Sequence, residues 1–512
     1  MQLIDQERAQ REVVSFLAAP ETHNGATVEC VTTHISRVFL AGDRAYKLKR
    51  ALKYEFADFS TAERRRLACE NELRVNRRAA PDLYLGVRPI YQDGCGASWR
   101  ESGPPVDWVV EMARFASTDQ FDRLLIAERL DDRLVWSLAD KLFDLHQKAP
   151  ICRARATARD PAANANALVE DLRRGALRGS RKADIDDWAM RAAAAFHSFR
   201  DLIEARFKDG RVRRCHGDLH LANICLFQGE VTPFDAIEFD DEVATIDVLY
   251  DLAFAAVDFA HFKRPQYANG LVNRYFGRSG DYGGLALLPA FASMRAIVRA
   301  MALGLAAKDP DGVDRAGDYL DLGLELLRAS PRPRLIAIGG LSGSGKSTLA
   351  RALAPGLGSA LGAVAISSDV VRKRLFGVAP ETSLDASAYR RDVTTRVYAQ
   401  MLEDAEAALR AGAVVILDAT YTNDEARGAA RRLAERRGAR FDGVWLTAPV
   451  ETLKGRVAAR SHDASDATLD VVAQQALKTV DLPSDWLTPG ECDNVDAMRD
   501  TVLSMLNIAS PA

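Results

Sequence analysis

The chain has 512 residues, of which 48% are hydrophobic and 27% charged, and these fractions exclude a disordered or fibrous protein. At roughly 100–200 residues per domain, this length predicts two to four domains. The 68 basic and 71 acidic side chains leave a net charge of −3, which argues against a long polyanion or an anionic membrane as the main partner.

The seven cysteines include no C-x-x-C pair and predict a reduced, cytoplasmic protein. The N-terminal stretch MQLIDQERAQREVVSF carries charges of both signs and lacks the apolar run of a signal peptide, so export is not expected. The most apolar segment, residues 285–307, contains Arg295 and Arg299. Such charges are costly inside a bilayer, so this segment is predicted to be a buried helix.

Taken in chain order, the predicted elements form a small β-rich lobe, a helical lobe and an α/β domain. The first lobe has strands at 27–32, 37–40, 44–48 and 108–112 and a helix at 61–79. From about residue 117 the pattern is mainly helical, with a polar interruption at 215–240. Pro331 and Pro333 mark a linker, because proline cannot continue a helix.

After the linker, strands alternate with helices, which predicts a parallel sheet covered on both faces. The expected strands are 335–338, 363–367, 413–417 and 441–446. The expected helices begin near 346 and span 369–376, 388–411, 424–437 and 450–460.

The loop after the first of these strands matches G-x-x-x-x-G-K-[ST] and precedes a helix, as a phosphate-binding loop requires. Its glycines let backbone N–H groups surround phosphate oxygens. Lys346 is expected to bridge the β- and γ-phosphates, and Ser347 to ligate Mg²⁺. The predicted nucleotide-binding residues of this loop are Gly340, Ser342, Gly343, Ser344, Gly345, Lys346, Ser347 and Thr348.

Two later segments carry further polar residues of this domain. Asp369 and Arg372, three residues apart, share one helix face and can point into one cleft. Asp418 ends a strand, where it is placed to hold Mg²⁺ through water. The alternatives are helix capping for the two aspartates and a surface position for the arginine.

With the phosphate loop, these segments resemble the P-loop kinases of the zeta-toxin, gluconate-kinase and polynucleotide-kinase group, over about residues 335–485. The resemblance implies that Asp369 lies at the acceptor hydroxyl and that Arg372 holds substrate or phosphate. It also implies that Arg456 and Arg460, four residues apart on a helix, are lid arginines. An exposed helical face explains these two arginines nearly as well.

The string HGDLHLAN, residues 216–223, is the most informative of the chain. Asp218 and Asn223 repeat the D-x-x-x-x-N spacing of a kinase catalytic loop, in which the aspartate accepts the hydroxyl proton and the asparagine ligates Mg²⁺. Twelve residues later, Asp235 ends an apolar strand and is placed for the second metal contact. The alternatives are a purely structural loop and a metal hydrolase that uses His216, Asp218 and His220.

This string, Asp235 and the later Tyr-Asp-Leu-Ala at 250–253 resemble the aminoglycoside phosphotransferase and choline-kinase type of protein-kinase-like fold, over about residues 25–325. The resemblance implies phosphoryl transfer from a nucleotide to a small-molecule hydroxyl, with Asp218 and His216 as catalytic residues. One departure is that Glu238 follows Asp235 by three residues, where the family commonly has its acidic residue at two. Whether Asp235 alone meets the metals, or Glu238 and Asp240 as well, is left open.

A nucleotide clamp is expected in the small lobe. Lys47 is the predicted phosphate lysine, but Lys49 lies on the same strand face. Glu72 is the preferred partner on the next helix, and Glu70, about 200° away around that helix, is the alternative. Solvated surface charge is the other explanation for these groups. The strand at 108–112 is expected to end in the adenine-contacting hinge.

The whole chain resembles bacterial fusions of an aminoglycoside-phosphotransferase-like domain with a P-loop kinase-like domain. The implied fold is an α+β protein-kinase-like bilobal fold followed by an α/β P-loop NTPase fold with a parallel sheet. Its predicted limits are 1–115 for the small lobe, 116–328 for the helical lobe, 329–334 for the linker and 335–512 for the P-loop domain.

The predicted function is ATP- or GTP-dependent, Mg²⁺-requiring phosphoryl transfer to a sugar, an aminoglycoside or a similar hydroxyl compound, with one nucleotide site in each module. Acceptor pockets are expected in residues 120–210 and 255–325. Two alternatives remain. The P-loop module is a polynucleotide 5′-hydroxyl kinase, although aromatic residues are sparse beside its cluster of Arg431, Arg432, Arg436, Arg437 and Arg440. Otherwise, one module is a non-catalytic nucleotide sensor that regulates the other.

Overall fold

The computed structural model describes residues 2–53, 57–94, 96–175, 177, 179, 181–306, 310–329, 332–459, 464–477 and 480–508. The chain divides into two compact units. Unit 1 comprises Met1–Leu134, Asp144–Arg159 and Phe207–Asp251, and unit 2 comprises Val135–Phe143, Asp160–Arg206 and Leu252–Ala512.

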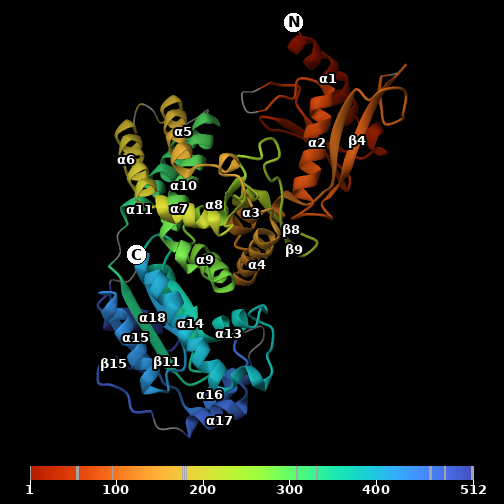
Figure 1. Cartoon of the computed structure of the whole chain (residues 1–512). Coiled ribbons are helices and arrows are strands. Elements are labelled where there is room, and N and C mark those ends of the chain that lie inside the picture. The colour runs from red at the N-terminus through yellow and green to blue at the C-terminus, as the bar shows by residue number, and fades with distance from the viewer. Residues whose placement is uncertain are drawn as a thin grey trace. The chain divides into compact units, whose positions relative to one another are not determined.

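Unit 1 opens with a six-stranded sheet in the order β1-β2-β3-β6-β4-β5, whose adjacent strands are all antiparallel (Figure 1). The predicted strands are confirmed as β1 (Val28–Thr32), β2 (Ser36–Ala41), β3 (Arg44–Lys49) and β6 (Asp107–Ala113). Helix α1 (Gln2–Ala18) and strands β4 (Tyr84–Asp93) and β5 (Gly96–Ser98) were not predicted. Val13 and Leu17 of α1 belong to one apolar cluster with Phe39 and Leu48 of the sheet, so α1 is part of this core.

Helix α2 (Ala62–Asn76) confirms the predicted helix and packs on β6. It begins at Thr61, whose hydroxyl accepts a hydrogen bond from the Arg64 amide at 3.2 Å, as an N-cap residue does. The buried Arg65 binds Asp107 at the start of β6, with Nε 2.7 Å from Oδ1. This anchor sets the rotation of α2 about its axis and therefore which of its carboxylates faces the sheet.

The polar interruption at 215–240 folds as short strands and loops. Strand β7 (Val212–Arg214) pairs with β10 (Thr245–Asp247), and β8 (Ile224–Phe227) forms a hairpin with β9 (Glu230–Pro233). The one-turn 3₁₀ helix Leu221–Asn223 lies between them. Helices α3 (Phe121–Ile126) and α4 (Asp132–Lys148) precede this region, and α7 (Arg200–Lys208) leads into it.

The helical part of unit 2 contains α5 (Pro161–Arg174), α6 (Lys182–Ser198), α9 (Pro265–Ser279), α10 (Leu288–Ala306) and α11 (Pro310–Arg328), and α8 (Val248–His261) enters it from unit 1. Among the described residues, the segment Tyr282–Ala306 is the one stretch long and apolar enough to span a membrane, and 67% of its window is buried within the protein. Ser293 donates to the Gly323 carbonyl and accepts from the Trp188 indole, and α10 packs on α11. These are the contacts of a core helix.

The second part of unit 2 confirms the predicted parallel sheet, in the order β12-β13-β11-β14-β15. Its strands are β11 (Arg334–Gly340), β12 (Val364–Ser367), β13 (Val414–Asp418), β14 (Arg440–Leu446) and β15 (Trp486–Leu487). Helices α12 (Lys346–Leu353) and α18 (Val495–Met505) share one apolar cluster with alternate residues of β11, β13 and β14. Helices α14 (Arg391–Arg410) and α15 (Asp424–Arg436) also pack on this sheet. The intervening residues of β11 and β13 are fully buried too, so both faces of the sheet are covered.

Helix α9 covers the open edge of this sheet. The Asn273 side chain donates to the Ala363 carbonyl at 3.1 Å and accepts from the Ala365 amide at 2.7 Å, as a neighbouring strand would do. Asn269 donates to the carbonyls of Leu361 and Ala363, each at 2.9 Å. An unpaired edge invites aggregation, so these two asparagines protect β12.

One arginine of α9 also anchors the loop that follows α13 (Ser368–Leu375). Arg274 binds Asp140 at 2.6 Å and Glu381 at 2.5 Å, with both oxygens of each carboxylate engaged.

We expect Arg274→Met to destabilise unit 2 by about 2 kcal/mol, because both partly buried carboxylates lose their cation. Urea denaturation measures the loss. Arg173→Met, which removes an exposed arginine that bridges Glu170 and Asp186, should cost much less than Arg274→Met, because exposed ion pairs contribute little to stability. Equal losses in the two variants would contradict this role for Arg274.

Candidate active sites

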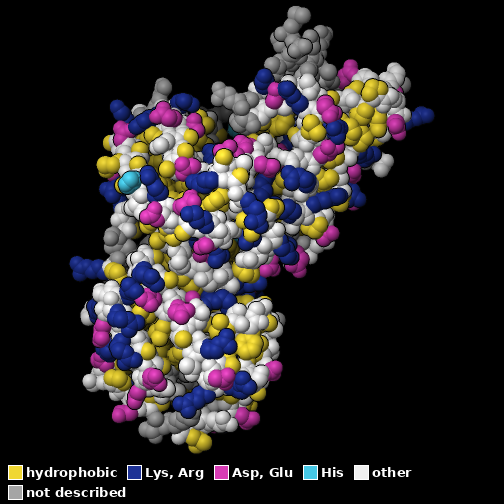
Figure 2. Space-filling view, in the orientation of Figure 1, with side chains coloured by type: hydrophobic (Ala, Val, Ile, Leu, Met, Phe, Trp, Pro, Cys, Tyr) yellow, Lys and Arg dark blue, Asp and Glu magenta, His cyan; other side chains and the backbone are white. Residues whose placement is uncertain are grey.

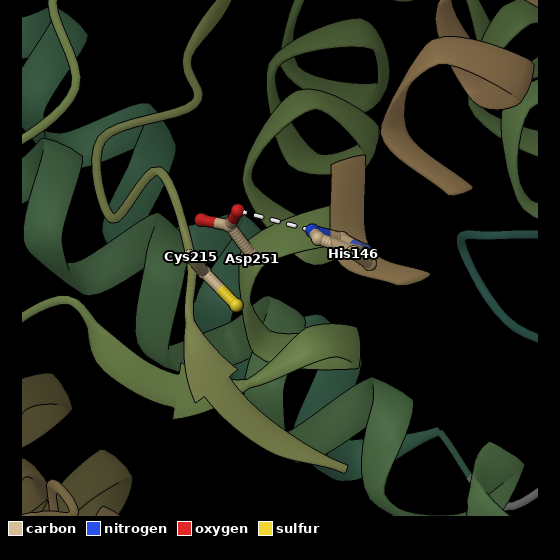
Figure 3. A group of neighbouring side chains, drawn as sticks. All are labelled: His146, Cys215 and Asp251. Atoms are coloured by element: carbon tan, nitrogen blue, oxygen red, sulfur yellow. Dashed lines mark hydrogen bonds and ion pairs between the residues drawn. The ribbon is translucent and has the colours of Figure 1, made fainter. Parts of the chain in front are cut away.

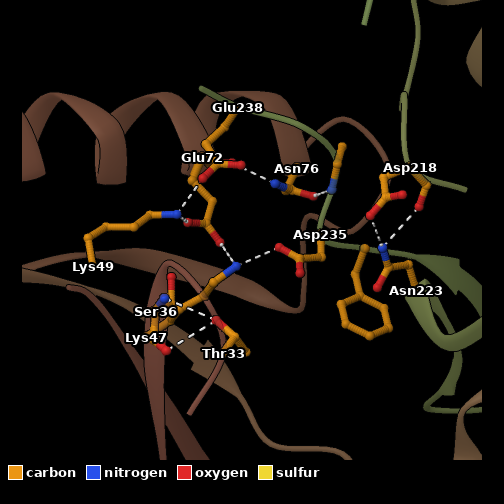
Figure 4. A network of polar contacts seen from close by, with 12 residues as sticks. Thr33, Ser36, Lys47, Lys49, Glu72, Asn76, Asp218, Asn223, Asp235 and Glu238 are labelled. Atoms are coloured by element: carbon orange, nitrogen blue, oxygen red, sulfur yellow. Dashed lines mark hydrogen bonds and ion pairs between the residues drawn. The ribbon is translucent and has the colours of Figure 1, made fainter. Parts of the chain in front are cut away.

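Five alternating charges form a continuous chain in unit 1 (Figure 4). Lys47 Nζ lies 2.5 Å from Asp235 Oδ1 and 2.7 Å from Glu72 Oε1. The other oxygen of Glu72 lies 2.5 Å from Lys49 Nζ, and Lys49 also binds Glu238. The carboxylate of Glu72 therefore divides its two oxygens between two lysines.

The contacts distinguish the two lysines and the two glutamates that the sequence offered for the clamp. Lys47 and Lys49 are both buried and both meet Glu72, but Lys47 alone of the two also reaches Asp235. Glu70 instead pairs with Arg66 on the exposed side of α2. Burial by itself would raise the pKa of Glu72, but the two ammonium groups outweigh it and lower that pKa to about 2. Glu72 is therefore a charged, buried anchor for both lysines.

Asp235 occupies a strained backbone position at the end of the β8–β9 hairpin. Its φ is 60°, in the left-handed region that few non-glycine residues adopt. Its amide donates to the Tyr84 hydroxyl at 3.1 Å, and the next amide, of Ala236, donates to Asn76 Oδ1 at 2.8 Å. Strain of this kind persists where neighbours hold it in place, and it is common at functional sites. The side chain of Asp235 remains 41% exposed, so its carboxylate is accessible to a ligand.

The residues predicted as catalytic base and metal ligand contact each other. Asn223 Nδ2 donates to the Asp218 carbonyl at 2.9 Å and to Asp218 Oδ2 at 3.0 Å. This orientation leaves the amide oxygen of Asn223 as a ligand atom. His220 Nε2 lies 3.5 Å from the same carboxylate oxygen. The oxygens of Asn223 and Asp235 are the type of donor that Mg²⁺ prefers, so the residues fit this ion.

His216 supports the candidate catalytic loop, residues 216–223, through both ring nitrogens. Nε2 lies 2.9 Å from the Phe234 carbonyl, and Nδ1 accepts from the Asp218 amide at 3.3 Å. Burial lowers the pKa of His216, which favours the neutral ring that these two contacts require. His216 was predicted as catalytic. In the structure it holds Asp218 and the residue before Asp235, and its occupied nitrogens leave none for the metal-hydrolase alternative.

The shifted pKa of His216 predicts a pH effect on stability. The unfolded chain takes up this proton near pH 6.5 and the folded chain only at lower pH, so folding becomes less favourable as the pH falls below about 6.5. We expect wild type to lose up to about 1.4 kcal/mol per pH unit more than His216→Asn. Guanidinium denaturation at pH 7.5 and 5.5 measures this difference. Identical pH dependence in the two proteins would refute the prediction.

A buried group behind this loop was missed by sequence reasoning. Asp251 accepts hydrogen bonds from the amides of His216 at 3.0 Å and Gly217 at 2.9 Å, and His146 Nε2 lies 3.2 Å from it (Figure 3). Gly217 has a φ of 87°, and a Cβ there would come within 3.0 Å of Ala244. Asp251 therefore fixes the backbone of the catalytic loop. The sequence signal for Asp251 is the Tyr-Asp-Leu-Ala stretch at 250–253, which carries the family resemblance but does not show what the aspartate contacts.

His146, Cys215 and Asp251 also have the composition of a metal site, with ligand atoms within 4.8 Å of one another. Burial raises the pKa of the Cys215 thiol well above its ordinary value, and Sγ donates to the Ile246 carbonyl. A protonated thiol is a poor metal ligand. Since Asp251 is engaged by the catalytic loop, the trio is better explained as the support of that loop.

The phosphate loop of unit 2 has the expected geometry. Gly340, Gly343 and Gly345 all have positive φ, and a Cβ on Gly343 would lie 2.6 Å from the Leu453 carbonyl oxygen. Lys346 Nζ bonds to the Leu341 carbonyl across the loop at 2.9 Å. Ser347 Oγ donates to Asp418 Oδ2 at 2.6 Å. This hydroxyl and carboxylate are the pair that holds Mg²⁺ in P-loop enzymes, so the residues fit the ion.

Asp369 and Arg372 lie on α13 and line the same cavity, but they have different surroundings. Burial, and then the charge of Asp418, raise the pKa of Asp369, as suits a group that accepts a proton. Arg372 is buried, donates to the Ala388 carbonyl at 2.5 Å and lies over the Tyr389 ring. Arg372 therefore shapes the loop that forms one wall of the cavity.

The lid arginines are placed only in part. Arg456, on α16 (Val450–Ala458), donates to the Gly343 carbonyl at 3.5 Å and so faces the phosphate loop. Arg460 lies outside the described residues. Gln475 on α17 (Leu469–Ala476) accepts a hydrogen bond from the Ser342 amide at 2.8 Å. No sequence pattern predicted this contact.

An ion pair between the buried Lys373 and the partly exposed Asp466 lies beside this site and was also missed. Lys373 Nζ lies 2.5 Å from Asp466 Oδ2 and donates to the Thr382 carbonyl at 2.5 Å. Asp466 further accepts from the Leu384 amide at 3.1 Å and from the Tyr389 hydroxyl at 2.5 Å. The pair ties the loop after α13 to the segment before α17.

These elements surround a cavity of about 680 Å³. Residues of the phosphate loop line it together with polar side chains from other segments. These polar residues include Ser368, Asp369, Arg372, Tyr389, Thr394, Tyr398, Thr420, Ser465 and Asp466. Hydroxyl groups predominate among them, which suits a small polar ligand.

Two regions match family models. Residues 36–288 match the phosphotransferase enzyme family, and residues 335–481 match an AAA domain. Uncharacterized proteins of Mycobacterium tuberculosis and of Mycobacterium bovis are each 31% identical over 479 residues, which cover 92% of this chain and 93% of the relative. The match to these relatives therefore extends over both modules.

Two solved structures are similar to separate parts of the chain. A choline/ethanolamine kinase family protein from Mesorhizobium loti is 16% identical and covers 62% of this chain and 99% of its own, with a TM-score of 0.38. A gluconokinase from Sinorhizobium meliloti 1021 is 19% identical and covers 35% of this chain and 93% of its own, with a TM-score of 0.26.

Proposed function

The chain belongs to the family of these mycobacterial proteins and carries a phosphotransferase-family domain followed by a P-loop kinase domain, and from this premise we propose that it has two kinase sites with small hydroxyl acceptors. Kinases of these types use ATP and Mg²⁺. In each module the γ-phosphoryl group passes from ATP to an acceptor oxygen, and ADP leaves. The acceptor proton passes to an aspartate of the chain.

In the N-terminal module Asp218 takes the acceptor proton, and Asn223 orients its carboxylate. Lys47 positions the donor phosphates, and Asn223 and Asp235 hold Mg²⁺. When bound, this ion neutralises the charge of the phosphates. Glu72 keeps Lys47 in place. Positioning and charge neutralisation are the main sources of catalysis in phosphoryl transfer, and these groups supply both.

In the C-terminal module Asp369 takes the acceptor proton and the phosphate loop holds the nucleotide, with Ser347 and Asp418 at Mg²⁺. Arg456, which lines the same cavity, neutralises the charge of the phosphoryl group during transfer. One observation carries the proposal: the candidate base, the metal pair and the phosphate loop line a single cavity of about 680 Å³. Arg372 holds the loop after α13, which lines this cavity, by donating to the Ala388 carbonyl.

Two features favour a small acceptor over a polynucleotide 5′-hydroxyl. In the arginine cluster on and after α15, Arg431 pairs with Asp485, Arg437 with Glu406 and Arg440 with Asp442. On the face shown in Figure 2, basic and acidic side chains are interspersed. Binding to single strands uses a basic groove with stacking aromatic side chains, and paired arginines supply less of the positive charge.

A screen for ATP consumption tests the proposal. Wild type, Asp218→Ala and Lys346→Ala are each assayed with sugars, sugar acids, amino alcohols and aminoglycosides, and GTP replaces ATP in a parallel series. We expect each variant to lose one set of acceptors and to keep the other. Turnover that depends on only one module would favour a nucleotide sensor in the other module. Phosphorylation of single-stranded oligonucleotides would favour the end-kinase alternative.

We also propose a cytoplasmic location. The six described cysteines are free thiols, and Cys95 lies outside the described residues. Free thiols and an ATP-dependent activity both suit a reducing compartment. Fractionation of the producing cells tests this location.

A further inference from the structure

The second lysine of strand β3 is a fully buried charge to which the proposed reaction assigns no task. The side chain of Lys49 has no exposed surface, and that of Glu238 is 4% exposed. Taking such charges out of water is unfavourable, and replacing a buried ion pair by apolar residues often leaves a protein no less stable. Stability therefore gives little reason for this pair, and its position beside Lys47 and Asp235 suggests another.

The pair links the two elements that carry the reacting groups of this site. Lys47 and Lys49 are two residues apart on one strand and point to the same side. Asp235 and Glu238 are three residues apart in the loop opposite, and each meets one lysine. The extra lysine and the unusual spacing of Glu238 are thus two halves of one contact. Glu238 is committed to Lys49, which leaves Asp235 for the metal.

Three other contacts hold the same loop to the small lobe. Asn71 donates to the Glu238 carbonyl, Asn76 accepts from the Ala236 amide, and Tyr84 accepts from the Asp235 amide. All three engage the backbone. The ion pair with Lys49 adds a side-chain contact at the far end of the loop, three residues beyond the strained Asp235.

Lys49 also shares with Lys47 the neutralisation of Glu72. The buried carboxylate of Glu72 needs a cation, and Lys49 occupies one of its two oxygens at 2.5 Å. With that oxygen neutralised, Lys47 is shared between single oxygens of Glu72 and Asp235. Without Lys49, Lys47 would be the one remaining cation beside the fully buried carboxylate of Glu72. Glu72 would then attract Lys47 more strongly.

We propose that Lys49 and Glu238 are positioning residues of the N-terminal kinase site: their ion pair holds the loop of Asp235 in its metal-binding orientation and releases Lys47 for phosphate. The inference rests on the proposed function of this module. Groups that orient a metal ligand typically change metal affinity by about 10–100-fold when they are removed.

The test measures metal binding directly. The full chain carries Lys346→Ala, so that the N-terminal module alone loads nucleotide, and free Mn²⁺ is followed by electron paramagnetic resonance in the presence of a non-hydrolysable ATP analogue. We expect Lys49→Met/Glu238→Gln to raise the Kd of Mn²⁺ by about 10-fold or more. The double variant removes one charge of each sign, so its melting temperature should lie above that of Lys49→Met alone. A merely structural pair would move the melting temperature and leave the Mn²⁺ affinity unchanged.

Controls separate this inference from the function on which it rests. Lys53→Met/Asp58→Asn removes a pair of the same charge types from the same lobe, in which Lys53 is exposed and Asp58 half-buried, and should bind Mn²⁺ as the parent does. If the double variant does not fold, Glu238→Asp provides the second test. This variant keeps the charge but shortens the side chain, and it should raise the Kd of Mn²⁺ by about 3-fold or more. Parent-like affinity in a folded double variant, or in Glu238→Asp, overturns the inference. A parent that binds no Mn²⁺ with the nucleotide overturns the proposed function itself.

Discussion

Asp218→Ala is expected to lower kcat of the N-terminal module by about 10²- to 10⁴-fold, because the variant lacks the carboxylate that takes the acceptor proton. Asn223 donates to this carboxylate, whereas the phosphate lysine is held by Glu72 and Asp235. The loss should therefore fall on kcat, while the Kd of the nucleotide changes little. Steady-state ATP consumption in the Lys346→Ala background measures the effect without a contribution from the other module.

Asp240→Ala is the matched control for this experiment. Asp240 lies in the same segment, but its carboxylate accepts from the amides of Glu242 and Val243 and so caps a turn. Its removal should leave kcat within about 3-fold of wild type, as expected for a residue outside the proton path. A folded Asp218→Ala protein with normal turnover would exclude Asp218 as the base of this module.

Asp369→Asn is expected to lower kcat of the C-terminal module by a similar factor of about 10²–10⁴. The variant keeps the size and position of the side chain but cannot accept the acceptor proton. Because Ser347 and Asp418 hold each other at 2.6 Å without Asp369, the Kd of the nucleotide should change little. The assay uses the Asp218→Ala background and an acceptor of this module.

Asp385→Asn provides the comparison for Asp369→Asn. Asp385 lies in the loop after α13, and its carboxylate accepts from the Ser387 amide at 2.8 Å at the start of a short 3₁₀ helix. This variant should retain nearly full activity. If it lost as much as Asp369→Asn, loop structure and not proton transfer would explain both results.

Much of the chain could be predicted because its signals are local. In the P-loop domain, the alternation of short apolar runs with amphipathic segments corresponds closely to β11–β14 and α12–α16. Strand β4 was missed, since Gly86 and Pro89 interrupt its pattern and the pairing shifts register between Tyr84 and Gly86. Helix α1 was not predicted, and its residues Val13 and Leu17 become part of a core only against the sheet.

The site residues likewise separate into those with a local sequence signal and those that depend on tertiary packing. Asp218 and Asn223 were predicted from a five-residue spacing, and they contact each other directly. His216 was predicted as catalytic because it belongs to the same string. Its ring nitrogens bind backbone groups of Phe234 and Asp218. A string of sequence cannot show whether a histidine faces substrate or the backbone, because that depends on segments folded around it.

By itself, the sequence determined that the chain has two kinase-like modules. It also predicted the residues proposed to bind phosphate and the two aspartates proposed as bases, because each of these depends on residues within about one turn or one loop of each other. The tertiary structure decided that Glu72 serves two lysines, that Glu238 belongs to Lys49 and that Asp251 supports the catalytic loop. These contacts join residues 23 to 189 positions apart, as Lys49 and Glu238 show. A charge buried on folding needs a partner, and only the packing of distant segments determines which one it meets.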